Sequence, residues 1–223
     1  QCEVLRCAPH GYKRIRNTTE KTEIQMAKLY FKFGAMGCSK TAQALITKFN
    51  YEERGMKVLL LKPAVDNRDG ETITKSRIGL QAQALAVRDN EDLYALYKRA
   101  YSACNVVIVD ECQFLMPEQV DELGQIVIDF NVPVLCFGLA TDFTTHMFPG
   151  SKRLFEIAES ISEIKSVCKC GAKATVNARM DDHGNIVFKG EQVCLGGNDR
   201  YVAMCRKCWL KKKAEQEAKG LYL

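Results

Sequence analysis

The chain contains Gly34-Ala35-Met36-Gly37-Cys38-Ser39-Lys40-Thr41 between an apolar run, residues 27–33, and a helical apolar pattern, residues 41–54. This spacing is that of a phosphate-binding loop, in which backbone N–H groups and a lysine surround phosphate oxygens and the next hydroxyl ligates Mg²⁺. Ser39 stands where such a loop usually has its second glycine, so a Cβ is added beside the phosphates. A glycine-rich turn that happens to carry a lysine is the alternative interpretation of these residues alone.

The segments around this loop predict an α/β fold with a mostly parallel sheet flanked by helices. Residues 57–62 form a near-continuous aliphatic run, which is typical of a strand buried on both faces. Strand, loop, helix and strand together make a βαβ unit. Residues 63–83 are rich in turn residues and lack an apolar repeat, so we expect a long loop beside the nucleotide. Further strands are expected at 84–87, 105–109 and 132–138, and further helices at 91–102, 117–130 and 151–160.

Two acidic residues, Asp110 and Glu111, directly follow the apolar run 105–109. The carboxyl ends of parallel strands form the ligand-binding edge of such a sheet, so we expect this pair near the phosphate loop. The first acid can hold the hydrated Mg²⁺, and the second can accept a proton from an attacking hydroxyl. An acidic pair that only caps a helix is the alternative when these residues are taken alone.

The eleven cysteines are an odd number for a disulfide scaffold, and several lie in apolar strands. Four of them form two close pairs, Cys168 with Cys170 and Cys205 with Cys208, separated by 34 residues. Four thiolates suit a closed tetrahedral zinc site, which would hold residues 171–204 as a tethered loop able to fold over a small ligand. A redox dithiol, simple thiols in turns and a zinc ribbon for nucleic acid are the alternatives.

The composition is that of an ordinary globular chain, with 47% hydrophobic and 26% charged residues. No run approaches the ~18 apolar residues of a membrane span, and no signal-peptide core is recognisable, so we expect a cytoplasmic protein. The net charge of +5 comes from the ends: residues 1–25 carry five basic and three acidic side chains, and residues 205–223 carry six and two. We therefore expect solvated ends and no nucleic-acid or membrane partner.

These motifs, in this order, resemble the type II thymidine kinases, a tetrameric zinc-containing class found in bacteria and in animal cytosol. The resemblance covers about residues 26–210. Besides the phosphate loop, it is carried by Asp66-Asn67-Arg68, Ser76-Arg77-Ile78-Gly79, Asp110-Glu111-Cys112-Gln113-Phe114, Gly138-Leu139-x-Thr141-Asp142-Phe143, Phe148-x-Gly150-Ser151 and Gly196-Gly197-Asn198-x-x-Tyr201, followed by Cys205-Arg206-Lys207-Cys208.

The resemblance implies transfer of the γ-phosphoryl group of ATP to the 5′-hydroxyl of thymidine or deoxyuridine, by a homotetramer that uses Mg²⁺ and structural Zn²⁺. It implies Glu111 as the catalytic residue and Cys168, Cys170, Cys205 and Cys208 as the metal ligands. The implied ATP and Mg²⁺ site is Gly34, Ala35, Met36, Gly37, Cys38, Ser39, Lys40, Thr41, Asp66, Asn67, Arg68, Asp110 and Gln113. The implied nucleoside site is Met36, Leu139, Phe143, Gln192, Val193, Cys194, Leu195, Gly196 and Tyr201, with the backbone of residues 192–196 reading the pyrimidine edge.

The same resemblance divides the chain into four regions. Residues 26–166 are expected to form a P-loop kinase domain, and residues 167–210 a small zinc-binding lasso domain. Residues 1–25 are interpreted as an N-terminal extension, disordered or non-native, and residues 211–223 as a basic tail. Two other functions stay open: a catalytically impaired nucleotide-binding relative, suggested by Ser39, and a zinc-ribbon nucleic-acid binder, suggested by the cysteine pairs and the basic end.

Overall fold

The centre of the molecule is a six-stranded sheet with the order β5-β2-β6-β7-β1-β8, in which every pairing is parallel. The structure is a computed structural model that describes residues 26–68, 70–192 and 201–221. The predicted α/β class with a mostly parallel sheet is confirmed. The strands of this sheet are β1 (Leu29–Phe33), β2 (Val58–Pro63), β5 (Leu85–Val87), β6 (Val106–Val109), β7 (Val134–Gly138) and β8 (Ser160–Glu163).

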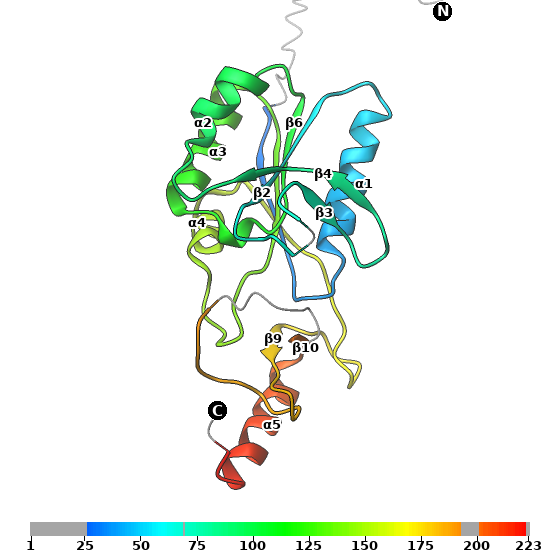
Figure 1. The fold of residues 1–223 in the computed structure, drawn as a ribbon, viewed down its shortest axis with the longest axis vertical. Helices are drawn as coiled ribbons and strands as arrows, with labels where there is room; N and C mark the ends of the chain where they lie inside the picture. The colour runs from blue at the N-terminus through cyan, green and yellow to red at the C-terminus, as the bar shows by residue number, and fades with distance from the viewer. Residues whose placement is uncertain (1–25, 69, 193–200, 222–223) are drawn as a thin grey trace, which may run out of the picture.

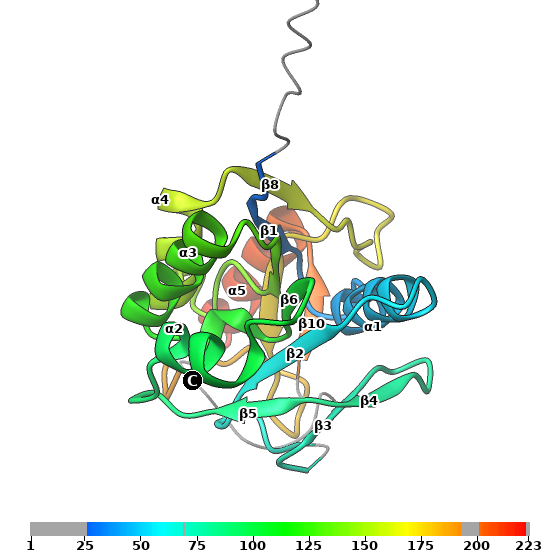
Figure 2. The same cartoon turned by 90° about the horizontal axis from the view of Figure 1, so that it is seen from above.

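Helices cover both faces of the sheet, which explains why its central strands are aliphatic on both sides. Helix α1 (Lys40–Glu52) packs on one face, whereas α2 (Leu93–Leu96), α3 (Pro117–Phe130) and α4 (Pro149–Ile157) pack on the other (Figure 2). Alternate residues of β6 point to opposite faces: Val107 and Val109 join the core under α3, and Val106 and Ile108 join the core under α1.

The residues that follow the central strands meet at one edge of the sheet. Gly34, which follows β1, donates its backbone N–H to the carbonyl oxygen of Gly138 at the end of β7, at 3.3 Å. Asp110, which follows β6, donates its backbone N–H to the carbonyl oxygen of Leu61 in β2, at 3.0 Å. The carboxyl edge of the sheet therefore gathers loops from four strands, as expected for a ligand site in this fold class.

The expected loop at 63–83 is wrong in its second half. Strands β3 (Ile73–Lys75) and β4 (Gln81–Gln83) pair there as an antiparallel hairpin. The buried Lys62 anchors it, because its Nζ donates to the carbonyl oxygens of Gly70 and Ile73, each at 2.8 Å. Three-residue strands with polar side chains give no apolar alternation, so the sequence pattern missed them.

Two predicted helices also differ from the observed ones. The helix expected at 91–102 begins as α2 after Asp92, whose side chain accepts a hydrogen bond from the backbone N–H of Ala95, and continues as a π-helical turn, Tyr97–Tyr101. The helix expected at 151–160 begins at Pro149 and ends at Ile157, and the chain then enters β8, which pairs with β1. Proline at the first position fits a helix start.

Beyond β8 the chain forms a C-terminal unit, residues 167–192 and 201–218, that lies below the carboxyl edge of the sheet in Figure 1. It contains the antiparallel pair β9 (Val176–Arg179) and β10 (Tyr201–Met204), and helix α5 (Arg206–Ala218). Residues 211–218, expected in a tail, are therefore helical. No helix in the described parts of the chain is long and apolar enough to cross a bilayer.

Candidate active site

A cavity of about 330 Å³ opens at the carboxyl edge of the sheet. The phosphate loop, the loop after β2, the β3–β4 hairpin, the residues that follow β6 and β7, and the C-terminal unit all contribute to its wall. The described residues of the predicted site that line this cavity are Met36, Gly37, Ser39, Lys40, Thr41, Asp66, Arg68, Asp110, Glu111, Gln113, Leu139, Phe143, Gln192 and Tyr201.

The remaining predicted residues divide into three groups. Gly34, Ala35 and Cys38 lie behind the cavity wall, where each contacts the Lys40 ammonium. Asn67 is exposed and does not line the cavity. Val193, Cys194, Leu195 and Gly196 lie outside the described residues.

The phosphate loop joins β1 to α1 through an unusual backbone. Gly37 and Ser39 have positive φ angles of 76° and 68°. Ser39 thus has a left-handed backbone conformation although it is not glycine. Gly34 has no room for a side chain, because a Cβ there would lie 2.3 Å from the carbonyl oxygen of Ile164.

Lys40 is the cation of this loop. Its side chain is buried, and its Nζ donates to the carbonyl oxygens of Gly34 at 3.2 Å and Ala35 at 3.1 Å. A buried ammonium needs hydrogen-bond acceptors, and carbonyl groups of its own loop supply them here. Because an ammonium has three donors and no acceptor, Lys40 is suited to bind an anion at this edge.

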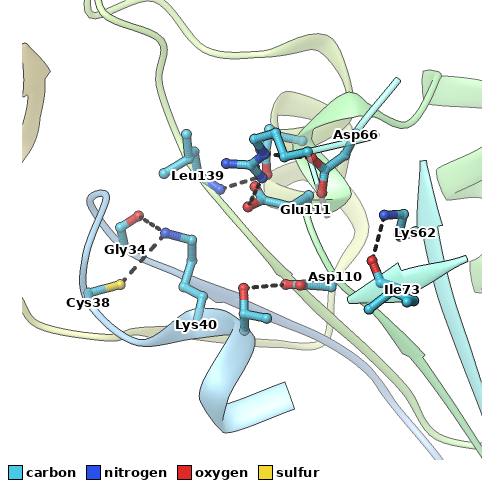
Figure 3. A network of polar contacts seen from close by, with 12 residues as sticks. Gly34, Cys38, Lys40, Lys62, Asp66, Ile73, Asp110, Glu111 and Leu139 are labelled. Carbon is cyan, nitrogen blue, oxygen red and sulfur yellow. Dashed lines mark hydrogen bonds and ion pairs between the residues drawn. The ribbon is translucent and has the colours of Figure 1, made fainter. Parts of the chain in front are cut away.

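Asp110 faces the first turn of α1. Thr41 Oγ1 donates to Asp110 Oδ1 at 3.4 Å, and both residues line the cavity. Figure 3 shows this hydrogen bond as the dashed line that ends on Asp110. Burial and, next in size, the neighbouring charge of Glu111 together raise the pKa of Asp110 to about 7. Oxygen ligands of this kind are those that Mg²⁺ prefers, and a divalent cation would offset the cost of burying the Asp110 carboxylate.

Glu111 is held by two side chains. Arg68 Nη2 donates to its Oε1 at 2.7 Å, and Gln113 Nε2 donates to its Oε2 at 2.6 Å. Gln113 is itself fixed, because its Oε1 accepts the backbone N–H of Leu139 at 3.0 Å. Burial alone would raise the pKa of Glu111, but the charges of Arg68 and Lys40 and these hydrogen bonds lower it below its usual value. Glu111 is therefore an oriented, ionised carboxylate.

Another part of the cavity wall is mostly aromatic and aliphatic. Phe143 is buried there, and Leu139, Tyr201 and Gln192 lie nearby on the same cavity. The side chain of Gln192 is fixed, because its Nε2 donates to Asp142 Oδ2 at 3.0 Å. An apolar wall with a few oriented polar groups suits a planar ring.

Sequence analysis missed two residues that organise this wall. Asn177 accepts the backbone N–H of Met36 at 2.8 Å and donates to the carbonyl oxygen of Thr141 at 2.8 Å. It therefore links the phosphate loop to the loop after β7. The second is Arg179, whose Nε donates to the Tyr201 hydroxyl at 2.9 Å. Both residues belong to strand β9, and the sequence of this strand contains no recognisable motif.

The hairpin also brings groups to the cavity that no prediction named. Thr74 is buried and lines the cavity, and its hydroxyl has no hydrogen-bond partner among the described residues. Arg77 reaches the phosphate loop, because its Nη1 lies 3.3 Å from the position that a Cβ on Gly37 would occupy. The hairpin is thus a polar wall that faces the phosphate loop.

The four predicted cysteines meet in the C-terminal unit. The sulfur atoms of Cys168, Cys170, Cys205 and Cys208 all lie within 4.8 Å of one another, and the Cys170 and Cys205 sulfurs are 3.6 Å apart. Zinc–sulfur bonds of about 2.3 Å place the corners of a tetrahedron about 3.8 Å apart, so the cluster fits this ion. Backbone N–H groups of Cys170 and Cys205 lower the pKa of Cys168 to about 6, which favours a thiolate.

A parallel sheet with a phosphate loop between β1 and α1, and with an oriented acidic pair after β6, defines a nucleotide-binding protein of the P-loop class. Comparison with known proteins narrows this class. A family model described as thymidine kinase matches residues 27–209. The chain belongs to the thymidine kinase family, and the resemblance found in the sequence is confirmed.

Relatives match this chain over nearly their whole length. A thymidine kinase of Zymomonas mobilis is 44% identical over 189 residues, which cover 84% of this chain and 98% of the relative. A thymidine kinase of Enterobacteria phage T4 is 46% identical over 186 residues, which cover 82% of this chain and 96% of the relative. A thymidine kinase of Idiomarina loihiensis is 42% identical over 198 residues, which cover 88% and 100%.

Proposed function

We propose that this protein is a thymidine kinase that transfers the γ-phosphoryl group of ATP to the 5′-hydroxyl of thymidine or deoxyuridine. One observation carries this proposal: a single cavity is lined by Lys40 and the acidic pair and also by Phe143 and Tyr201. Groups suited to phosphates and groups suited to a base ring thus border one space. The names of the relatives support the choice of nucleoside.

The phosphate side of the cavity binds ATP. Backbone N–H groups of the loop and the Lys40 ammonium contact the phosphates, and this exchanges the carbonyl partners of Lys40 for phosphate oxygens. Thr41 and Asp110 would hold Mg²⁺, which neutralises charge on the phosphates when it is bound. Arg68 and Asp66 stand beside this group and fix the loop after β2.

Glu111 is the proton acceptor. As the oxygen–phosphorus bond to the nucleoside forms and the bond to the ADP oxygen breaks, the proton of the 5′-hydroxyl passes to the Glu111 carboxylate. The lowered pKa keeps this carboxylate ionised at neutral pH, which is the form that can accept a proton. Gln113 and Arg68 orient it for this step.

The aromatic side of the cavity holds the base. Met36, Leu139, Phe143 and Tyr201 wall the ring. The role of the backbone of residues 192–196 at the pyrimidine edge comes from the family resemblance alone, since residues 193–196 lie outside the described residues. The cysteine cluster would hold a structural Zn²⁺ that fixes the C-terminal unit. Family membership also supports three further parts of the proposal. The chain has a P-loop domain and a lasso domain, it assembles as a homotetramer, and it is located in the cytoplasm.

A phosphate-transfer assay across deoxynucleosides tests this function, with zinc quantified on the same sample. We expect ADP formation with thymidine and deoxyuridine, none with purine deoxynucleosides, and about one zinc per chain. Binding of ATP and thymidine without product would instead support an impaired relative. Steeply salt-dependent oligonucleotide binding without nucleoside phosphorylation would support a zinc-ribbon protein.

A further inference from the structure

Arg179, at the end of β9, has three contacts that converge on the aromatic wall of the cavity. Its guanidinium carbon lies 3.7 Å from the centroid of the Phe143 ring. Its Nε donates to the Tyr201 hydroxyl at 2.9 Å, and its Nη2 donates to the backbone carbonyl of Gln192 at 3.3 Å. The side chain is only 7% exposed, so these contacts take place away from bulk water.

The three partners come from separate parts of the chain. Phe143 belongs to the loop after β7, whereas Gln192 and Tyr201 belong to the C-terminal unit. All three line the cavity, and Arg179 is not among the described residues that do so. The guanidinium therefore lies behind the wall and touches it from outside the space that a ligand would fill.

We propose that Arg179 is a positioning residue that fixes the base end of the cavity by holding Gln192 and Tyr201 against Phe143. This inference rests on the proposed function, because it assigns the aromatic wall to a pyrimidine ring. Phe143 and Tyr201 both line the space that the proposed function gives to the ring, so their positions limit the size of the ring that fits. Arg179 thereby contributes to the affinity for a single-ring base without contacting it.

Only arginine has the shape for this role. The guanidinium is planar, so its face can stack on the Phe143 ring while the N–H groups at its edge donate hydrogen bonds to two oxygen atoms. A lysine ammonium keeps the charge but is a compact group that cannot stack and donate in this way. Replacement by lysine therefore tests whether the planar shape of the side chain is needed in addition to its positive charge.

The experiment compares Arg179→Lys and Arg179→Met with the wild-type protein. We expect the KM for thymidine to rise about tenfold in both variants, since two hydrogen bonds and a stacked contact are lost. The KM for ATP should stay within about twofold, because no Arg179 contact reaches the phosphate side. Arg153→Lys is the matched control: Arg153 is part of α4 and pairs with Asp121 and Glu156, so both KM values should stay unchanged.

A double-mutant cycle tests the route through Tyr201. Tyr201→Phe removes the hydroxyl that accepts the Arg179 hydrogen bond and keeps the ring. If Arg179 acts through this hydroxyl, Tyr201→Phe should raise the thymidine KM less in the Arg179→Met background than in the wild-type background. Zinc content and the thermal midpoint are measured on every variant, so that a loss of folding is recognised and only folded variants are compared.

Two results would overturn the inference: an unchanged thymidine KM in folded Arg179 variants, or equal increases in the KM values for thymidine and ATP. Either result with an active wild-type enzyme leaves the proposed function standing. A wild-type protein that phosphorylates no pyrimidine deoxynucleoside would overturn both the function and the inference.

Discussion

Arg68 donates to Glu111 at 2.7 Å and to Asp66 at 2.6 Å, so one guanidinium joins the loop after β2 to the acidic pair after β6. Glu111 has a left-handed backbone, with φ of 51° and ψ of 38°, which is unusual for a residue other than glycine. Such a conformation persists where the surrounding structure fixes it. The position and ionisation of this carboxylate are therefore set by the protein before a substrate binds.

Glu111→Gln should abolish most of the activity while leaving the cavity intact. Glutamine keeps the size of the side chain but cannot accept a proton, so we expect kcat for ADP formation to fall about 10²- to 10⁴-fold. The Kd for ATP should change little. Glu118→Gln, an exposed residue of α3, is the control and should keep wild-type kcat. A Glu111→Gln variant with kcat near that of wild type would contradict the role of proton acceptor.

Asp110→Asn should change how stability depends on pH. The pKa of Asp110 is raised to about 7 in the folded protein, so between about pH 4 and pH 7 the folded state binds more protons than the unfolded chain. The contribution of this group to stability therefore falls as pH rises through that range. Because asparagine is neutral throughout, the free energy of unfolding of the variant relative to wild type should grow by on the order of 1 kcal/mol per pH unit.

Urea unfolding at pH 5, 6 and 7 in the absence of Mg²⁺ measures this difference. A difference between Asp110→Asn and wild type that stays constant with pH would show that the Asp110 pKa is not raised.

Ser39→Gly should stabilise the protein without changing nucleotide binding. Ser39 is exposed, has φ of 68° and makes no side-chain capping hydrogen bond. Glycine relieves the strain of a left-handed backbone, so we expect the free energy of unfolding to rise by about 1 kcal/mol. The KM for ATP should stay within twofold, since the loop already has this conformation. A tenfold lower KM in the variant would mean that the Ser39 side chain crowds the phosphates.

Cys205→Ser should remove the metal and loosen the C-terminal unit. Its apolar clusters are small, one around Trp209 and Ile186 and one around Cys168 and Ala174, so a metal ion bound by the four thiolates would carry much of its stability. We expect the zinc content to fall from about one per chain toward zero, together with a lower thermal midpoint. Cys104→Ser, which lies outside the cluster, should keep its zinc. Full zinc content in Cys205→Ser would exclude this residue as a ligand.

Lys62→Met should free the β3–β4 hairpin. The two carbonyl oxygens that Lys62 contacts, those of Gly70 and Ile73, are the link between the end of β2 and the hairpin. Without this link, amide hydrogen exchange in residues 73–83 should become faster while exchange in β6 stays slow. Lys98→Met, an exposed residue of the π-helical turn, should leave both segments unchanged. Equal protection of the hairpin in Lys62→Met and wild type would refute the anchoring role.

The sequence predicted the parts of the fold that have a strong local pattern. Strands β2, β6 and β7 are near-continuous apolar runs because both of their faces are buried. Strand β8 has one large apolar residue, Ile161, and this side chain is 42% exposed. It pairs at the edge of the sheet, where burial imposes no pattern, so local sequence could not distinguish it from the end of the preceding helix.

The residues of the candidate site also differ in whether a local sequence pattern reveals them. The phosphate loop and the acidic pair could be recognised because each is a short contiguous motif whose chemistry dictates its spacing. Asn177 and Arg179 could not, since their roles depend on partners far away in the chain: Met36 lies 141 residues from Asn177, and Tyr201 lies 22 residues from Arg179. The Met36–Asn177 contact is created by the packing of the C-terminal unit on the sheet edge, and the Arg179–Tyr201 contact by the pairing of β9 with β10, so no short sequence pattern predicts either.

The Asn177 amide connects two loops that border the cavity. Its side chain, which belongs to the C-terminal unit, is hydrogen-bonded both to the backbone of the phosphate loop and to the backbone of the loop after β7. A displacement of that unit would therefore act on the phosphate loop and on the loop after β7 at the same time. A metal ion bound to the four cysteines would thereby influence how the two proposed substrates are aligned with each other.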